Sequence, residues 1–462
     1  MLRSTLCLWC IALLAAPFAF GQAEQASITG SVSDVSKAIV PDAQISVRNL
    51  ATNLTVHTSS NSSGLYYVRA LTPGTYELRV EKSGFRSSKV ENIPLTVGLT
   101  ATVDVAMQVG TVAESVEVQA SAVQLEAQTS GVGTVINTRP VLELPLLGRN
   151  PLSFAALAPG VIPTSGQQFN GGGIVGVATT AQIGGGLAQQ NGVLIDGAES
   201  RGTTESGNSF SLPVEAVAEV KIETTTYAAN LGRAAGGIIN IATKSGTDQF
   251  HGTGYEFLRN DHLNANGWQN NRNKIAKTLF QRNLFGGNLG GPIIRDRTFF
   301  FFNYEGVRQG APDQVLGTVP TDAQRAGDFS RTFDRNGNLD VIYDPTSTGP
   351  DPSNSAKLIR TPYPGNIIPP DKISSISAKV VTFYPEPNRP GIGPQVVNNY
   401  LRTGKSVTNT DNYFARVDHL INEKHRVFGR FGYTPYTNFS TLPGVVYASR
   451  GVSSNPGTQA LI

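Results

Sequence analysis

Residues 227–252, YAANLGRAAGGIINIATKSGTDQFHG, separate two different kinds of sequence pattern. Before them, short β-prone segments alternate with glycine and other small residues; after them, aromatic residues recur at alternate positions in longer segments. Within this run, one β-prone stretch, Ile238–Thr243, is flanked by Gly232, Gly236, Gly237 and Gly246. Glycine permits backbone conformations and close approaches that other residues do not. The pattern predicts a compact domain that passes its chain, through a hinge at Ser245 and Gly246, into a large β-barrel.

Composition supports β-structure. The 462 residues, which suggest two to four domains, include 49 glycines, and only 15% are charged. This mixture suits turn-rich β-sheets or an outer-membrane barrel better than a helical enzyme. The net charge of +3 is too small to indicate a nucleic-acid partner. Beyond the N-terminus no stretch approaches eighteen apolar residues, so any entry into a membrane must use strands.

Residues 1–21 have the pattern of a cleaved export signal. Arg3 precedes an apolar core at 6–16, and small residues at Ala19 and Gly21 mark a cleavage site. The alternatives, a transmembrane anchor and a lipoprotein, are disfavoured by the short apolar run and by the residues before Cys10. Since Cys7 and Cys10 both lie in this signal, the mature chain has no cysteine for a disulfide, a thiolate metal site or a nucleophile.

Residues 26–109 are predicted to form a β-sandwich. Turn residues separate short alternating segments at 28–32, 43–47, 54–58, 65–68, 75–80 and 101–107. The motif G-x-V-x-D at 30–34, followed by LTPGTYELRV and SGF, resembles a carboxypeptidase-regulatory-like (CnaB-type) domain. No histidine begins an H-x-x-E pair and no H-E-x-x-H occurs, so a zinc peptidase is not indicated.

Residues 127–245 are predicted to be a mixed α/β domain. Short helices are expected at 139–144 and 151–157, a loop at 165–190, strands at 192–195 and 220–224, and a turn or helix at 214–218. The motifs LPLLGRN, NGVLIDG and GRAAGGIINIATKSGT, in this order, resemble the plug of TonB-dependent outer-membrane receptors. The resemblance implies a mainly structural role for Arg149, Asn191, Asp196, Gly197, Gly232, Arg233, Gly236 and Gly237.

Residues 110–126 form a linker that contains the acidic, β-prone segment AESVEVQA at 113–120. Such a segment can add to the edge of another protein's sheet, because strand addition needs free backbone groups more than particular side chains. It resembles a TonB box, and the resemblance implies contact of TonB with Glu114, Ser115, Val116, Glu117 and Val118. An ordinary linker strand is the alternative.

From residue 246 to 462 the pattern predicts the first part of a transmembrane antiparallel barrel. Candidate strands lie at 252–258, 280–289, 298–305, 413–420 and 426–433. Their connections alternate between long and short, as in barrels whose long loops face outward. In 426–433, Val427, Phe431 and Tyr433 share one face, whereas Phe428 lies with the arginines on the other and makes the alternation imperfect.

The longest connection, 306–412, is rich in Pro, Asn, Asp and Gly. Its segments VPTDAQRAGDFS, VIYDP, PYPGNIIPPDKIS and FYPEPN resemble the large extracellular loop of Oar-like TonB-dependent receptors. Those receptors carry a CnaB-type domain before the plug.

Two further motifs have simpler interpretations. Gly171, Gly173 and Gly176 match G-x-G-x-x-G, but no strand precedes them and no clear helix follows, so a flexible loop is favoured over a nucleotide site. DRNGNLD at 334–340 offers oxygen ligands for calcium, but Gly337 is misplaced for an EF-hand and an Asn-Gly turn is favoured. No catalytic residue, cofactor site or metal site is predicted.

The expected fold is therefore mostly β: a carbohydrate-binding-like sandwich, an α/β plug and the first strands of an incomplete barrel. The resemblance implies a barrel of about twenty-two strands in the outer membrane of a Gram-negative bacterium, working with TonB, ExbB and ExbD. Its ligand could be an oligosaccharide, a peptide or a siderophore. Because an open sheet edge in lipid leaves backbone groups unpaired, we expect the chain alone not to insert stably.

The alternatives are a surface carbohydrate- or protein-binding module and an exported peptidase accessory. The first would need an exposed aromatic pair among Tyr66, Tyr67, Tyr76 and Phe85.

Overall fold

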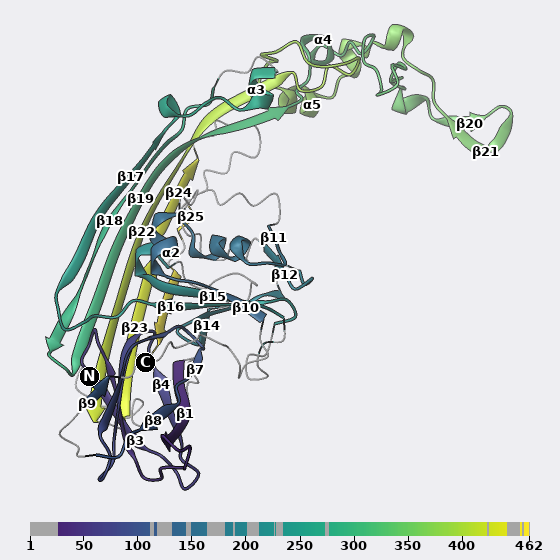
Figure 1. The fold of residues 1–462 in the computed structure, drawn as a ribbon. Coiled ribbons are helices and arrows are strands. Elements are labelled where there is room, and N and C mark those ends of the chain that lie inside the picture. Colours follow the sequence, from purple (N-terminus) through teal and green to yellow (C-terminus); the bar gives the residue numbers. More distant parts are fainter. Residues whose placement is uncertain are drawn as a thin grey trace, which may run out of the picture.

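The structure, a computed structural model, places three β-rich parts along one chain (Figure 1). It describes residues 26–110, 115–117, 132–144, 149–163, 181–187, 190–200, 212–225, 227, 234–272, 277–422, 425–440, 453–454 and 457–461. The expected export signal lies outside these residues. Within them, no helix is long and apolar enough to cross a membrane.

The N-terminal part is a sandwich of two sheets. Its strands are β1 (Ala26–Asp34), β2 (Gln44–Asn49), β3 (Thr55–Ser59), β4 (Leu65–Leu71), β5 (Gly74–Glu81), β6 (Ser87–Leu95), β7 (Thr100–Thr102), β8 (Val105–Met107) and β9 (Ser115–Glu117). One sheet has the order β4-β1-β7 with β8 also on β1, and the other has β3-β2-β5-β6-β9. Alternate residues of each strand fill the core, as in β5, where Tyr76, Leu78 and Val80 are buried.

The sequence did not predict strand β6. Asn92 in its middle has a positive φ of 56°, and the pairing with β5 shifts register nearby. This irregularity and Pro94 hide the alternation that marks the other strands. The single strand expected at 101–107 is two short strands, β7 and β8.

The second part is a small mixed domain. Its elements are β10 (Val132–Ile136), α2 (Thr138–Glu143), the 3-10 turns η1 (Pro151–Leu157) and η3 (Val214–Ala216), β11 (Val161–Pro163), β12 (Ala181–Ile183), β13 (Gly192–Ile195), β14 (Ala198–Glu199), β15 (Val217–Thr225) and β16 (Ile238–Thr243). Its main sheet has the order β10-β15-β16-β13-β14, with β13 parallel to β16. All six residues of β16 are buried. The loop expected at 165–190 contains β12, which pairs with β11.

The third part is a curved antiparallel sheet with long strands (Figure 1). Its strands are β17 (His251–Asn260), β18 (Gln281–Ile294), β19 (Thr298–Gly317), β22 (Tyr400–Asn422), β23 (His425–Thr434), β24 (Tyr436–Ser440), β25 (Ser453–Ser454) and β26 (Gly457–Leu461). All five predicted strands are present. The sequence missed β24 to β26: Pro435, which lacks an N–H, interrupts the strand after β23, and β24 then continues along β22. The sheet runs β17-β18-β19-β22-β23-β26, and among the described strands its two edges do not pair with each other.

The connection between β19 and β22 is shorter than expected, because both strands extend into the segment 306–412. The remainder has its own small elements: α4 (Asp322–Arg325), η5 (Pro345–Ser347), β20 (Gly349–Asp351), β21 (Asn354–Ile359), η6 (Pro364–Asn366), η7 (Pro370–Lys372) and α5 (Ser375–Val381). The other long connection, between β17 and β18, holds η4 (Asp261–Leu263) and α3 (Trp268–Arg272). Buried Asn366 ties the long loop together, since its side chain bonds to the backbone of Phe329, Asp340 and Ile342 at 2.7–2.9 Å.

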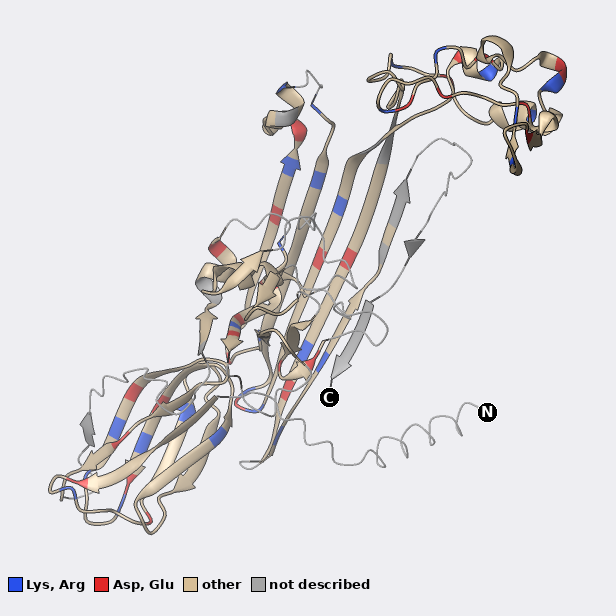
Figure 2. Ribbon diagram, turned by 90° about the vertical axis from the view of Figure 1, so that its right-hand side faces the viewer, with Lys and Arg blue, Asp and Glu red and all other residues tan. Residues whose placement is uncertain are grey.

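The sandwich lies at the end of the long strands where their turns are short, and the β19–β22 loop lies at the opposite end (Figure 2). The mixed domain lies against the concave face of the long sheet (Figure 1). Phe301 and Phe414 of this sheet belong to the same apolar cluster as Ile239 and Val220 of the mixed domain. We call the long sheet the wall and the mixed domain the plug.

Candidate functional site

The turn after β13 brings Asp196 to the wall. Asp196 and Gly197 both have positive φ, 48° and 79°, which fixes a tight turn between β13 and β14. The Asp196 carboxylate accepts hydrogen bonds from the backbone N–H and the hydroxyl of Thr243, at 2.8 and 2.7 Å. The same carboxylate forms ion pairs with Arg416 of β22 at 3.0 Å and Arg430 of β23 at 3.5 Å. The motif that resembles a plug sequence thus links the plug to the wall.

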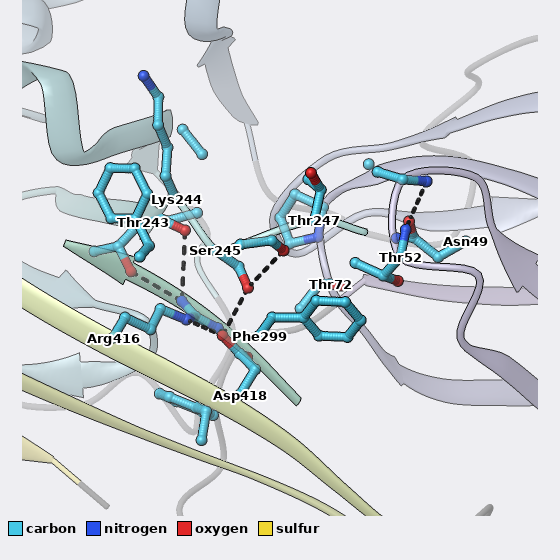
Figure 3. Close-up of a pocket in the computed structure, with 18 of the residues that line it drawn as sticks. Asn49, Thr52, Thr72, Thr243, Lys244, Ser245, Thr247, Phe299, Arg416 and Asp418 are labelled. Atoms are coloured by element: carbon cyan, nitrogen blue, oxygen red, sulfur yellow. Dashed lines mark hydrogen bonds and ion pairs between the residues drawn. The ribbon is translucent and has the colours of Figure 1, made fainter. Parts of the chain in front are cut away.

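A second carboxylate, Asp418, completes the cluster from the wall. Arg416 donates to it through Nε and Nη2, at 2.9 and 3.0 Å, so that Arg416 bridges Asp418 and Asp196. Arg426 also donates to Asp418 at 3.0 Å. The hydroxyl of Ser245, which follows the last plug strand, donates to Asp418 at 2.7 Å. Plug and wall therefore share one hydrogen-bonded network (Figure 3).

The network is almost completely removed from solvent. The side chains of Arg416, Arg430 and Asp418 are 5%, 1% and 3% exposed. Burying charges is costly, and the cost is recovered only when partners and hydrogen bonds are well placed. Removing one partner leaves the others buried without full compensation, so the cluster couples the position of the plug to the wall.

Sequence reasoning singled out Asp196, but it missed Arg416 and Asp418. Both lie in ARVDHL on β22, where alternate residues face inward. Charged residues at the inward positions of a barrel strand are the signal that could have indicated a contact with an enclosed domain.

Phe428 lies on the inward face of β23, as its strand position requires, and its side chain is half-buried. The Arg416 guanidinium is 4.6 Å from the centre of its ring. A cation over an aromatic face is attracted by the ring's quadrupole. The apparent break in the alternation at Phe428 therefore results from its contact with the charge cluster.

A cavity of about 360 Å³ lies where the three parts meet (Figure 3). The sandwich lines it with Leu54 and Pro73, and the wall lines it with Phe299 and Phe428. The plug contributes Thr243 at the end of β16, and the segment that follows contributes Thr247. It adjoins the charge cluster, because Asp196, Arg416 and Asp418 also line it.

Gly246 lies in the segment between plug and wall. A Cβ at this position would lie 2.3 Å from the carbonyl oxygen of Phe300 and 2.7 Å from that of Gly291. The wall backbone thus approaches too closely for any side chain. Sequence reasoning treated this glycine as a flexible hinge; the structure gives it a packing role.

Asp248, two residues further on, joins the sandwich to the wall. Its backbone N–H donates to the carbonyl of Ala51 at 3.0 Å, and its carboxylate accepts from the Asn53 amide at 2.7 Å. The other carboxylate oxygen accepts from the backbone N–H of Asp296, in the β18–β19 turn, at 3.1 Å. One side chain therefore holds a sandwich loop beside the start of the wall.

Glu219 joins the plug to the sandwich. Its carboxylate accepts the backbone N–H of Val97 at 2.9 Å. Burial raises the pKa of Glu219, and this hydrogen bond opposes the rise. Docking of the sandwich consequently depends on a carboxylate whose protonation is favoured in the docked state.

Arg149 lies at another plug–wall contact. It has a positive φ of 51° and forms an ion pair with Glu215 of the plug, with both side chains buried. Its guanidinium also lies 4.0 Å from the ring centre of Phe257 on β17. The residue combines a pairing role inside the plug with a stacking contact to the wall.

Asn191, Gly236 and Gly237 meet inside the plug. Asn191 donates to the carbonyl of Ala181 at 2.7 Å and accepts the N–H of Gly237 at 3.1 Å. A Cβ on Gly236 would lie 2.3 Å from the Asn191 side-chain oxygen. The glycines thus allow the chain to pass close to a buried amide. Gly232 and Arg233 lie outside the described residues.

The TonB-box-like segment is described only at Ser115, Val116 and Glu117; Glu114 and Val118 lie outside the described residues. These three form β9, which pairs in parallel with β6 of the sandwich. Residues 115–117 therefore form a strand whose partner is within the same chain.

The remaining motifs do not form sites in the part of the chain that the structure describes. There, no group of three or more His, Cys, Asp or Glu side chains could hold a metal ion. Asp334 closes the DRNGNLD turn by accepting the N–H groups of Asn336 and Asn338, both at 2.8 Å. The glycines of the G-x-G-x-x-G motif lie outside the described residues.

The aromatic residues considered for glycan binding do not form an exposed pair. Tyr66 and Tyr76 are each only 3% exposed, and the Tyr66 hydroxyl donates to the carbonyl of Val103. Phe85 packs against the sandwich core, and only Tyr67 is exposed. This arrangement disfavours the glycan-binding alternative.

Comparisons with known proteins agree with the sandwich and with the wall. A family model described as an outer membrane beta barrel domain matches residues 242–462, and one described as a carboxypeptidase regulatory-like domain matches residues 27–108. Over 296 residues the chain is 27% identical to the TonB-dependent transporter Oar of Myxococcus xanthus. The chain is therefore similar to the Oar-like TonB-dependent transporters.

The Oar-like chain spans part of its relative's length: the match covers 61% of this chain and 27% of the Myxococcus protein. The outer membrane transporter YddB from Escherichia coli is 10% identical, with coverage of 67% of this chain and 37% of that chain and a TM-score of 0.33. The siderophore receptor PirA from Acinetobacter baumannii is 16% identical, with coverage of 69% and 46% and a TM-score of 0.28. The assignment rests on the sequence matches.

These matches confirm the predicted order of two domains. The Oar-like chain combines a carboxypeptidase regulatory-like domain with an outer-membrane barrel domain, in the predicted order. Residues 242–462 match an outer membrane beta barrel domain, and the Myxococcus relative is a TonB-dependent transporter.

Proposed function

We propose that this Oar-like chain acts in TonB-dependent transport across the outer membrane. The wall supplies strands of the barrel, the plug blocks the lumen, and residues 114–118 are the contact for TonB. Residues 1–21 export the chain and are then removed. Tension applied by TonB, energised through ExbB and ExbD, shifts the plug and opens a path.

One observation carries this proposal: buried charges connect the plug to the wall. Asp196 of the plug contacts Arg416 and Arg430 of the wall, and Asp418 of the wall contacts Ser245 at the plug's exit. When the plug moves away, water can replace the hydrogen-bond partners of each of these side chains. Separating the plug from the wall therefore needs far less free energy than breaking a covalent bond. A domain that must be both held and released needs an interface of this kind.

We propose that the chain's ligand is an oligosaccharide, a peptide or a siderophore. The loop between β19 and β22 lies at the end of the wall opposite the sandwich, where a ligand would arrive (Figure 2). Asn366 holds this loop in one conformation, and Arg325 adds bonds to the carbonyls of Val381 and Tyr384 at 3.0 and 3.1 Å. A pre-ordered loop binds a ligand at a smaller cost in entropy.

The test is direct binding of the periplasmic C-terminal domain of TonB to the purified chain in detergent, measured by calorimetry. The Val116→Pro variant removes a backbone N–H from the TonB-box-like segment, so we expect its binding to fall below detection. Val123→Pro places the same substitution in the linker but outside the segment and should bind like the original chain. Absence of binding by the original chain, or equal loss in both variants, would refute the assignment of residues 114–118.

A further inference from the structure

The chain returns twice to the same edge of the sandwich. After β8, the N–H of Arg86 donates to Gln108 at 2.8 Å and the N–H of Gly110 donates to Gly84 at 3.1 Å. β9 then pairs with the next residues along the same strand, Ser87–Lys89 being opposite Ser115–Glu117. A segment tethered this closely has a high effective concentration at the edge of β6.

β9 is the last strand of its sheet. The order β3-β2-β5-β6-β9 places β6 on one side of it, and no described strand pairs with its other side. An edge strand presents a row of unpaired N–H and C=O groups and is a template for pairing with another chain. The sandwich therefore holds the TonB-box-like segment in the extended form that strand addition requires.

We infer that the sandwich presents β9 to TonB, and that the TonB domain adds to the outer edge of β9 while β6 remains paired with the inner edge. The two proteins then share one continuous sheet. This inference rests on the proposed TonB contact at residues 114–118. It assigns to the carboxypeptidase regulatory-like domain the role of a platform for the partner protein.

Presentation of a docked strand has an energetic reason. Fixing the backbone of a residue in one conformation costs conformational entropy. Because residues 115–117 are already ordered on β6, part of this entropy is lost before TonB binds. The sandwich also contacts the segment between plug and wall through Asn53 and Asp248, so a shared sheet connects TonB mechanically to the plug–wall junction.

A disulfide can fix β9 on β6. Ser87 and Ser115 are direct partners in the parallel register, and parallel partners lie at Cα separations that a disulfide can span. Cys7 and Cys10 are the only cysteines of the chain and both lie in the proposed export signal, so the mature chain gives a clean background. The test variant is Ser87→Cys/Ser115→Cys. The matched control is Ser46→Cys/His57→Cys, which joins β2 to β3 at the opposite edge of the same sheet.

Calorimetry with the TonB C-terminal domain then compares the oxidised and reduced forms. We expect the oxidised test variant to bind at least as tightly as its reduced form, and the control to show no difference. A weakening of more than about threefold on oxidation of the test variant alone, about 0.6 kcal/mol, would show that TonB needs an undocked strand and would overturn the inference. If neither redox form nor the original chain binds, the proposed TonB contact itself is wrong.

Hydrogen exchange in the complex provides a second readout. With TonB bound to the original chain, the amide of Ser88, which lies on the same side of β6 as that of Arg86, should keep its protection, because β9 stays paired with β6. Loss of that protection on binding would mean that TonB pulls β9 away from the sandwich, which also contradicts the inference.

Discussion

The charge cluster between plug and wall makes a quantitative prediction for Asp196→Asn. The substitution keeps the shape of the side chain and one carbonyl oxygen, which can still accept the backbone N–H of Thr243. The Thr243 hydroxyl can turn to accept a hydrogen bond from the new amide. The change therefore removes mainly the negative charge that faces Arg416 and Arg430.

The expected magnitude follows from burial. The side chains of Asp196, Arg416 and Arg430 are 7%, 5% and 1% exposed, so solvent screens their interaction little. Breaking a buried ion pair by removing one partner costs about 3–5 kcal/mol. In the variant, Arg416 still pairs with Asp418, and Arg430 still donates to the carbonyl of Ile195. We therefore expect a cost at the lower end of this range. A cost of about 3 kcal/mol corresponds to roughly a hundredfold change in an equilibrium constant.

Hydrogen exchange of the β16 amides in the detergent-solubilised chain measures this change. When opening is fast and reversible, the exchange rate reports the population of the open state. We expect the β16 amides to exchange roughly a hundredfold faster in Asp196→Asn than in the original chain.

The matched control is Asp104→Asn, another Asp→Asn change. Asp104 lies in the sandwich and accepts bonds from Ser31 at 2.7 Å, far from the wall, so β16 should exchange as in the original chain. A change of less than about threefold in Asp196→Asn, about 0.6 kcal/mol, would refute the reasoning, because the buried charges would then contribute almost nothing to holding the plug.

Three further predictions concern other parts of the structure. Burial raises the pKa of Glu219, although the hydrogen bond from the Val97 N–H opposes the rise. Docking of the sandwich should therefore be strongest in acid and weaken as pH rises through that raised pKa. In thermal unfolding, Glu219→Gln should abolish this pH dependence. Gly237→Ala should destabilise the plug by about 1–3 kcal/mol, because its Cβ would lie 2.1 Å from Ile183, and hydrogen exchange of the β16 amides measures this change. Its control, Gly267→Ala, has open space around it and should change exchange little. Asn366→Ala should cost the β19–β22 loop about 1–3 kcal/mol and speed its cleavage in limited proteolysis, since three backbone groups lose a buried partner.

Local patterns determined much of the architecture. The residues of β13 and β16 were predicted at their observed bounds, and all five expected wall strands are present. The reason is that strand alternation has a period of two residues and is visible within a short window. Where the local pattern is broken, as by Asn92 in β6 or by Pro435 before β24, the sequence alone did not reveal the strand.

The functional contacts were decided by the tertiary structure. Asp196 and Arg416 are 220 residues apart in the chain, and nothing near either residue indicates its partner. The close approach at Gly246 and the pairing of β9 with β6 likewise depend on which segments the fold brings together. By itself the sequence predicted a sandwich and barrel strands, because both are specified by short-range periodicity and turn residues, and its motifs resembled those of a plug. Only the folded structure decided how the three are joined, because a buried charge or a sheet edge acquires its partner from the topology of the whole chain.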